Sequence, residues 1–444
     1  NYAQLNLNSY KYSVALEHAW KAFESYSGRH TGFLSAIAKV MMQVERPDQA
    51  IEVYLKILDI SPSELQAMHE LALCYFFMNN VEKAEALLNQ VIIRAPQNAG
   101  AIHLRSALKT YSKSTNHIDE LKQLATHKAE AHPAVYYALA KELEDIGEFD
   151  ESFEYLKLGA GLMRKKVNYD ERAELSSIEN IVNVTLGTYF EDIKDNNPGP
   201  IFIVGMPRTG TTLVERILSQ HEHVHSLGEF SLFPQLLGSM ANEVMAKNKQ
   251  SVKNLHDAVM QIDFAELGRR YTDAASEISG GAIVTIDKLP VNFLYCGFIK
   301  KALPKAKIVH LCRNSMDTCY AIYKTLFINA YSFSYDLEEL ANYYISYRQI
   351  MDHWHHVMPG QILDIQYEDL VMDAEQVAKR LVEWCGMSFK SDLLNYYQTD
   401  SVSTTASAAQ IRKPIYTTSV QKWLRVERHL SVLKEKLKAS GLDV

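Results

Sequence analysis

A glycine-rich segment in the middle of the chain, residues 200–213 (PIFIVGMPRTGTTL), most restricts what the chain can fold into. It opens with a short apolar run rich in β-branched residues, which predicts a buried strand. Gly205 and Gly210 then predict a tight loop, and a helix is expected from about Thr211. A strand, a glycine loop and a helix N-terminus bring backbone N–H groups and the positive end of a helix dipole to one point, a geometry that binds phosphate.

The spacing of Gly205 and Gly210 is that of the Walker A loop, GxxxxGK[ST], but Thr211 stands where the Walker lysine belongs. Because that lysine reaches the β- and γ-phosphates of a nucleoside triphosphate, its absence disfavours a P-loop kinase or NTPase without removing that alternative. The cation lies instead at Arg208, before the second glycine. A glycine turn that only joins a strand to a helix is the other alternative.

The string PRTGTTL at 207–213 resembles the 5′-phosphosulfate loop of the sulfotransferases, whose pattern is P-[RK]-[ST]-G-T-[ST]. These enzymes take a sulfuryl group from 3′-phosphoadenosine 5′-phosphosulfate (PAPS). The resemblance implies a sulfotransferase fold, an α/β P-loop-like parallel sheet with helices on both faces, and transfer to a hydroxyl acceptor. It also implies that the donor is bound by Arg208, Thr209, Gly210, Thr211 and Thr212.

A second predicted strand, 307–312, runs into Arg313, and the string that begins there resembles the family's 3′-phosphate motif, R-[ND]-P-x-D-x-x-x-S. The resemblance assigns Arg313 to the 3′-phosphate. Ala321 stands where the family has a serine that hydrogen-bonds this phosphate, and losing such a bond costs about 1.5–3 kcal/mol. Tyr320 or Tyr323 could supply another donor. A catalytically impaired repeat scaffold that keeps a nucleotide-binding fold is therefore an alternative to an active enzyme.

Two further strings supply the remaining catalytic candidates. Glu229 belongs to a G-E pair like that of the tyrosylprotein sulfotransferases, and the string DKLPVN at 287–292 resembles the lysine motif of bacterial repeat-linked sulfotransferases. The resemblance implies that Glu229 takes the acceptor's proton and that Lys288 stabilises charge on the leaving oxygen, with Arg208 as the third catalytic residue. A solvated helix cap at Glu229 and a surface ion pair between Lys288 and Asp287 stay open.

Two late segments complete the resemblance. Tyr367 begins a Y-E-D-L string after a predicted strand, which implies a place near the adenine unless the ring only packs. Arg412 and Lys413 precede Pro414 and lead to SVQKW at 419–423, which is similar to the family's late basic loop. The resemblance implies that Arg412 and Lys413 offer cations to the 3′-phosphate, and an ordinary basic surface loop is the alternative.

The first part of the chain is predicted to be helix after helix with an internal period. Small residues and helix-ending prolines recur 34 residues apart, at Ala38 and Ala72, Ala50 and Ala84, and Pro62 and Pro96. This is the tetratricopeptide period, although a generic helical bundle stays possible as an alternative. We expect a tetratricopeptide-repeat domain over 1–190 and a sulfotransferase domain over 198–444. Such arrays bind proteins or peptides, so they could recruit the acceptor, and they also form dimers, so a homodimer stays open.

Composition disfavours several other classes. The net charge of −7 gives no support for a nucleic-acid partner, and no apolar run approaches the ~20 residues of a membrane span. The five cysteines form no paired framework, which predicts reduced thiols and a cytoplasmic location. His221, His223 and His225 have no carboxylate at ligand spacing, so no metal is expected. Protein tyrosine, carbohydrate and small alcohols are all open as acceptors.

Overall fold

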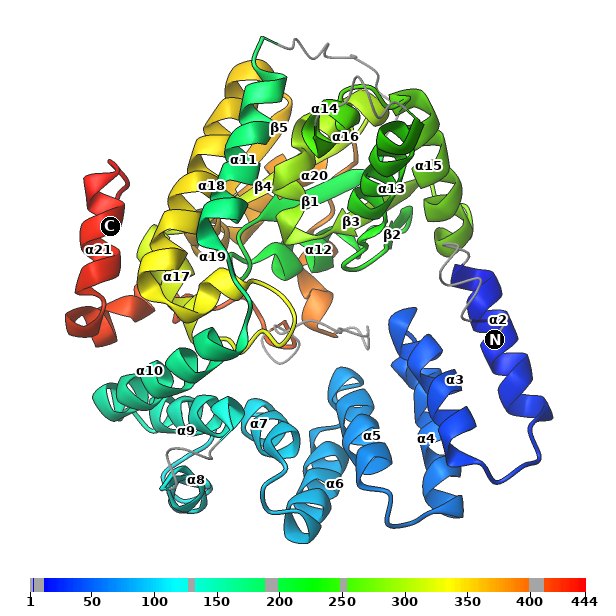
Figure 1. The fold of residues 1–444 in the computed structure, drawn as a ribbon, viewed down its shortest axis with the longest axis vertical. Coiled ribbons are helices and arrows are strands. Elements are labelled where there is room, and N and C mark those ends of the chain that lie inside the picture. The colour runs from blue at the N-terminus through cyan, green and yellow to red at the C-terminus, as the bar shows by residue number, and fades with distance from the viewer. Residues whose placement is uncertain (1–2, 4–11, 127–131, 188–198, 248–253, 399–410) are drawn as a thin grey trace.

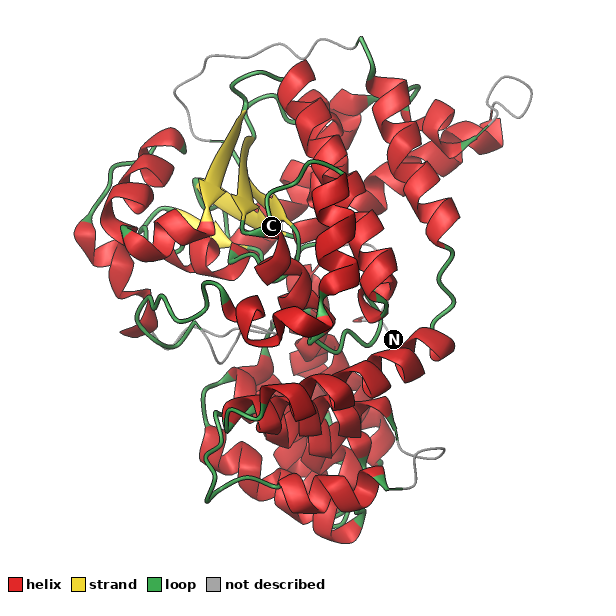
Figure 2. Cartoon of the chain, turned by 90° about the vertical axis from the view of Figure 1, so that its left-hand side faces the viewer, coloured by secondary structure: helices red, strands yellow, loops and turns green. Residues whose placement is uncertain are grey.

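The computed structural model describes residues 3, 12–126, 132–187, 199–247, 254–398 and 411–444. Its two parts differ in secondary structure: one contains helices alone, and the other is built on a β-sheet (Figure 2). No helix in the described ranges is both long enough and apolar enough to cross a membrane.

The helices of the first part pair into hairpins that follow one another in an arc along one side of the sheet domain (Figure 1). The predicted small residues Ala38, Ala50, Ala72 and Ala84 are all fully buried, so neighbouring helices cross closely there. These helices are α2 (Tyr12–Ser25), α3 (Thr31–Gln43), α4 (Pro47–Ile60), α5 (Leu65–Phe77), α6 (Val81–Arg94), α7 (Ala99–Ala107), α8 (Ile118–Ala125), α9 (Pro133–Asp145) and α10 (Phe149–Lys166). We call them the repeat region, and they confirm the predicted helical repeats.

The sheet domain, residues 199–444, is built on five parallel strands in the order β2-β3-β1-β4-β5. The strands are β1 (Ile201–Gly205), β2 (Val224–Ser226), β3 (Val284–Lys288), β4 (Lys307–Cys312) and β5 (Ile362–Gln366). Because β1 is central and the chain moves to either side of it, the strand order reverses beside β1, where open α/β sheets bind ligands.

Helices cover both faces of this sheet. Alternate residues of β1 point to opposite cores: Phe202 and Val204 to one, Ile201 and Ile203 to the other. All four side chains are fully buried, and burying each contributes roughly 1.5–3 kcal/mol. The helices are α12 (Thr211–Leu218), α13 (Leu232–Lys247), α14 (Leu255–Val259), α15 (Phe264–Ser279), α16 (Cys296–Ala302), α17 (Ser315–Tyr323), α18 (Leu337–Val357), α19 (Tyr367–Met372), α20 (Ala374–Trp384) and α21 (Ser431–Ala439), with 3-10 turns at Pro290–Tyr295, Ser332–Tyr335, Ser391–Gln398 and Lys422–His429.

The end of the repeat region shares a hydrophobic core with the sheet domain. The ring of Phe153, on α10, stacks on Tyr320 and Tyr323 of α17, with centroid distances of 6.5 and 5.9 Å. The next helix, α11 (Glu171–Thr185), packs against α18, and Asn342 of α18 donates a hydrogen bond to Glu171. The repeat region is therefore held to the sheet domain by buried apolar contacts, with ion pairs around them.

Two helical glycines of the sheet domain give a matched test of its packing. A Cβ added at Gly268, in α15, would lie 2.0 Å from the carbonyl oxygen of Ala302, whereas one added at Gly238, in α13, would meet no atom within 4 Å. We expect Gly268→Ala to lower the free energy of unfolding by about 1–3 kcal/mol, because the backbone must shift. Gly238→Ala should raise it by up to about 1 kcal/mol, because alanine favours the helix. Thermal unfolding of both variants measures the difference, and equal effects would contradict the packing described.

Candidate active site

The loop between β1 and α12 has the conformation expected of a phosphate-binding loop. Arg208 has a φ of +69° and Gly210 one of +104°. A Cβ at Gly210 would come within 2.6 Å of the Tyr367 ring, so glycine is required for that ring to lie against the loop. The Thr209 hydroxyl donates to the Met206 carbonyl at 2.8 Å and closes the loop internally. The predicted strand, loop and helix are therefore confirmed.

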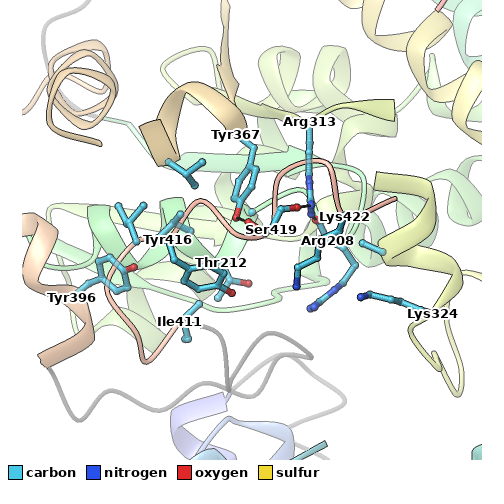
Figure 3. A pocket seen from close by; sticks show the side chains of 15 residues that line it. Arg208, Thr212, Arg313, Lys324, Tyr367, Tyr396, Ile411, Tyr416, Ser419 and Lys422 are labelled. Carbon is cyan, nitrogen blue, oxygen red and sulfur yellow. Dashed lines mark hydrogen bonds between the residues drawn. The ribbon is translucent and has the colours of Figure 1, made fainter. Parts of the chain in front are cut away.

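A pocket opens beside this loop (Figure 3). The predicted donor-binding residues that line it are Arg208, Gly210, Thr212, Arg313 and Tyr367. Those that do not line it are Thr209, Thr211, Arg412 and Lys413. Cationic side chains gather at one end, from Arg208, Arg313, Lys324 and Lys422, and two tyrosines, Tyr396 and Tyr416, lie at the other. The pocket thus offers positive charge on one side and flat aromatic surface on the other.

The guanidinium of Arg313 joins three segments at the cationic end. It donates to the carbonyl of Arg208 at 2.9 Å and to the carbonyl of Ser419 at 2.7 Å, and it lies over the Tyr367 ring at 4.8 Å from the centroid. Burial and the nearby charge of Arg313 lower the pKa of Arg208 to about 10, so Arg208 stays protonated at neutral pH. Arg208 therefore keeps its charge within a partly dry pocket beside the guanidinium of Arg313, which favours an anion.

Ala321 lines the same pocket, so the wall where the family has a serine offers only a methyl group. The structure does not place Tyr320 or Tyr323 there as substitutes, because both rings are buried and stack on Phe153. Lys324, one turn further along, lines the pocket instead. Its place at i+3 from Ala321 was the signal in the sequence that could have identified it.

Asp317 of α17 holds the late loop, the segment that contains residues 419–423. The two carboxylate oxygens of Asp317 accept hydrogen bonds from the backbone N–H groups of Gln421 and Trp423, at 2.6 and 3.2 Å. Because Lys422 lies between these two residues, the same bonds hold Lys422 at the pocket wall. The resemblance to SxxKW had already included Lys422 in its string, although the residue was not among those predicted to bind the donor.

The structure places Arg412 away from the donor pocket. Its guanidinium donates to the Phe77 carbonyl of the repeat region at 2.8 Å and lies 5.7 Å from the centre of the Phe76 ring. Lys413 is exposed, and its carbonyl accepts the hydroxyl of Tyr396 at 3.1 Å. Arg412 therefore contacts repeat helix α5 and not the pocket. The residues in contact are 335 apart in the sequence, so the sequence analysis did not anticipate the contact.

The predicted catalytic residues Glu229 and Lys288 form an ion pair. Strand β2 pairs with β3. Beyond the end of β2, the backbone N–H of Lys288 donates a further hydrogen bond to the Gly228 carbonyl at 3.0 Å. Lys288 Nζ then lies 2.7 Å from Glu229 Oε1. The lysine side chain is fully buried, whereas that of Glu229 is 44% exposed. The adjacent strands therefore present a buried cation and an accessible carboxylate side by side.

Two carboxylates that the sequence analysis did not select also surround Lys288. Glu215, on α12 four residues after Thr211, lies 3.7 Å from Lys288 Nζ. Glu45 comes from the turn between α3 and α4 of the repeat region, and its carboxylate lies so close to Gly228 that a Cβ there would be 2.3 Å away. Burial alone would lower the pKa of Lys288, but Glu215, Glu229 and Glu45 together raise it, so the lysine is held as a cation.

Asp287 does not form the surface ion pair with Lys288 that the sequence left open. It is fully buried and bonds to the Tyr271 hydroxyl at 2.9 Å and to the Asn292 amide at 3.1 Å. Burial raises the pKa of Asp287 well above its ordinary value. Asp287 therefore joins β3 to the helices around it, whereas Lys288 pairs with Glu229, and neither Lys288 nor Glu229 lines the pocket.

Within the described residues, the group of side chains with the geometry to hold a metal ion is His310, Cys312 and Asp364, which does not include His221, His223 or His225. His310 Nδ1 lies 2.8 Å from the Asp364 carboxylate, and its Nε2 bonds to the Tyr347 hydroxyl. Because both ring nitrogens are hydrogen-bonded within the protein, we assign this group to holding β4 against β5 and α18.

Comparison with known proteins agrees with this geometry. Residues 200–391 match the model of the sulfotransferase family, and residues 41–108 match a tetratricopeptide repeat model. The chain therefore carries a sulfotransferase-family domain behind tetratricopeptide repeats, as the sequence predicted.

Three similar proteins illustrate the match. An uncharacterised protein of Aquifex aeolicus is 29% identical over 410 residues, covering 90% of this chain and 53% of that protein, so the chain spans about half of that relative. Protein-tyrosine sulfotransferase 1 of Danio rerio is 23% identical over 275 residues, covering 55% of this chain and 72% of that protein. The solved sulfotransferase domain of a Synechococcus olefin synthase aligns with 58% of this chain and 100% of that domain, at 20% identity and a TM-score of 0.39.

Removing one acceptor from Asp317 tests whether this residue holds the late loop. In Asp317→Asn an amide NH₂ replaces one of the two oxygens and faces a backbone donor, which costs about 1–3 kcal/mol of local stability. We expect faster hydrogen exchange of the backbone amides of Gln421 and Trp423. The matched control is Asp352→Asn, whose carboxylate is 71% exposed. Unchanged exchange at 421 and 423 in the Asp317 variant would mean that other contacts hold the loop.

Proposed function

We propose that the chain transfers a sulfuryl group from PAPS to the hydroxyl group of an acceptor. The observation that carries the proposal is the pocket beside the glycine loop. The loop lacks the Walker lysine, and the pocket has a cationic end formed by Arg208, Arg313, Lys324 and Lys422 and an aromatic end. PAPS has the matching chemistry: an anionic 5′-phosphosulfate, a separate anionic 3′-phosphate and a flat adenine. The sulfotransferase-family match of residues 200–391 supports the same reaction class.

In this proposal the loop and Arg208 bind the 5′-phosphosulfate. Thr209 and Thr211 act through backbone N–H groups, because neither residue lines the pocket and the Thr209 hydroxyl already bonds within the loop. Thr212 lines the pocket with its side chain. Arg313 serves the 3′-phosphate, and Tyr367 supports Arg313 through the contact of its ring with the guanidinium.

The proposed chemistry is an in-line displacement that relies on positioning and charge stabilisation. Glu229 accepts the proton of the acceptor hydroxyl while the hydroxyl oxygen bonds to sulfur. The bond between sulfur and the bridging phosphate oxygen breaks, and its electron pair stays on that oxygen. Lys288 stabilises the charge that forms there, since its buried ammonium lies beside Glu229.

For the acceptor we propose a hydroxyl carried by a protein or peptide. The repeat region contributes Glu45 to the surroundings of Lys288 and contacts the late loop through Phe77, so an acceptor bound by the repeats would lie close to the catalytic pair. Relatives named protein-tyrosine sulfotransferases make a tyrosine side chain the first acceptor to test.

The nucleotide preference of the chain tests the donor. We expect adenosine 3′,5′-bisphosphate to bind more tightly than ATP, and to do so without magnesium, because the cationic end has positions for two separate phosphate groups and lacks the Walker lysine. Calorimetric titration of both nucleotides, with and without magnesium, measures this. Equal or tighter binding of ATP would favour the P-loop kinase alternative and overturn the proposal.

Exchanging Glu229 for glutamine tests the catalytic base. Glu229→Gln should lower kcat by roughly 10²–10⁴-fold, because the amide cannot accept the proton, while affinity for the bisphosphate stays nearly unchanged. The assay follows radiolabelled PAPS with a tyrosine peptide, an oligosaccharide and a primary alcohol as acceptors.

The matched control is Glu222→Gln, which removes an exposed carboxylate paired with Lys390. This variant should keep the kcat of the wild type. If Glu229→Gln also kept it, the base would lie elsewhere, with His225 and His223 as the next residues to exchange.

A further inference from the structure

The donor pocket has a cationic wall that the family motif does not account for. Ala321 leaves no hydroxyl at the place of the family serine, yet Lys324 and Lys422 line the same pocket. Lys324 follows Ala321 by three residues, so the two lie on the same side of α17 at its C-terminal end. A lysine ammonium can donate to a phosphate in place of a hydroxyl and adds a full charge.

Lys324 is held in place by the repeat region. Its Nζ lies 2.6 and 2.9 Å from the two carboxylate oxygens of Glu144, near the C-terminus of α9. It also lies 5.0 Å from the centre of the Tyr320 ring. Both partners of the ion pair are largely shielded from solvent, with side chains 25% and 18% exposed. A lysine has three N–H donors, so an ammonium bound to both oxygens of one carboxylate keeps a donor for a second anion.

Positive charge exceeds negative charge around this pair. Lys324, Lys422 and Arg425 all act on Glu144. Burial raises the pKa of Glu144, but these three cations lower it by more, so the net pKa is below the ordinary value and the carboxylate stays ionised. One carboxylate among three cations leaves an excess that a phosphate monoester, with a charge of about −2, can neutralise.

The contact between the two parts of the chain at this point is firm. Phe153 stacks on the tyrosines that flank Ala321, and the Tyr137 hydroxyl donates to the Tyr323 carbonyl at 3.4 Å. Glu144 lies on α9, the helix that carries Tyr137. Helix α9 therefore sets the position of the carboxylate relative to α17.

We propose that Lys324 binds the 3′-phosphate of the donor in place of the family serine, and that Glu144 of the repeat region positions it. The inference rests on the proposed function, since it assigns a ligand to one end of the donor. It makes the repeat region part of the donor site, so that nucleotide affinity depends on how α9 docks on α17.

The test compares two nucleotides that differ only in the 3′-phosphate, adenosine 3′,5′-bisphosphate and adenosine 5′-monophosphate, by calorimetry on the full chain. Lys324→Ala should weaken the bisphosphate tenfold or more, about 1.4 kcal/mol, and leave the monophosphate unchanged. Lys324→Arg should restore most of the loss. Glu144→Gln should weaken the bisphosphate severalfold, and adding it to Lys324→Ala should cause no further loss, because the two residues act as one unit.

The control is Lys122→Ala, which breaks an ion pair of the same type with Glu151. Neither residue lines the pocket, so both affinities should stay unchanged. A wild-type chain that binds neither nucleotide would overturn the proposed function itself. A wild type that prefers the bisphosphate, with a Lys324→Ala variant that loses both nucleotides equally or neither, would overturn only the role of Lys324. Tighter bisphosphate binding by Glu144→Gln would show that Glu144 competes with the phosphate, and would overturn its positioning role.

Discussion

The buried guanidinium of Arg313 is the interaction on which the pocket depends. Arg313 directly follows strand β4, and its guanidinium donates to the loop after β1 and to the late loop. It therefore fixes the distance between segments more than 100 residues apart in sequence. Both of these bonds are to neutral carbonyls, while the carboxylate of Asp317 lies 4.0 Å away and bonds to the late loop. Its charge is therefore only partly compensated, and the pocket holds a site for an anion in a drier medium than water.

The ion pair of Lys288 and Glu229 follows the opposite rule, because the charge of Lys288 is compensated in excess. A fully buried ammonium must be paired, and three carboxylates from α12, the segment after β2 and the repeat region act on it. The pocket beside the glycine loop is thus positive, whereas the surroundings of Lys288 are negative. This separation suits a reaction in which one end must bind a multiply charged nucleotide and the other must remove a proton from a hydroxyl.

The sequence predicted those parts of the site that depend on local order along the chain. These parts are the strand, glycine loop and helix around Arg208 and the strand that ends before Arg313. Each is formed by residues that are neighbours in the sequence, and the structure contains all of them. The sequence could not predict where Arg412 points or that a carboxylate pairs with Lys324, because these contacts depend on repeat helices α5 and α9. Glu144 and Lys324 are 180 residues apart, and no spacing rule connects them.

Glu215 was missed for a different reason. A glutamate on a short amphipathic helix is ordinarily a solvated residue, and its burial follows from the serine that donates to it, Ser226 of β2, together with Lys288. Only the pairing of β2 with β3 brings both partners to the helix. Glu229 and Lys288 lie together in the structure because each lies at the end of one of two adjacent strands, and their catalytic roles stay a proposal.

The repeat region differs from a flexible adaptor that only delivers an acceptor. Its last helices share a core with α17 and α18, and its residues reach both ends of the site: Glu45 beside Lys288 and Glu144 beside Lys324. If Lys324 binds the 3′-phosphate as proposed, its ion pair with Glu144 makes that contact depend on the docking of α9. A partner that shifts the repeats by a fraction of an ångström would then act on the proposed donor site as well as on the proposed acceptor site.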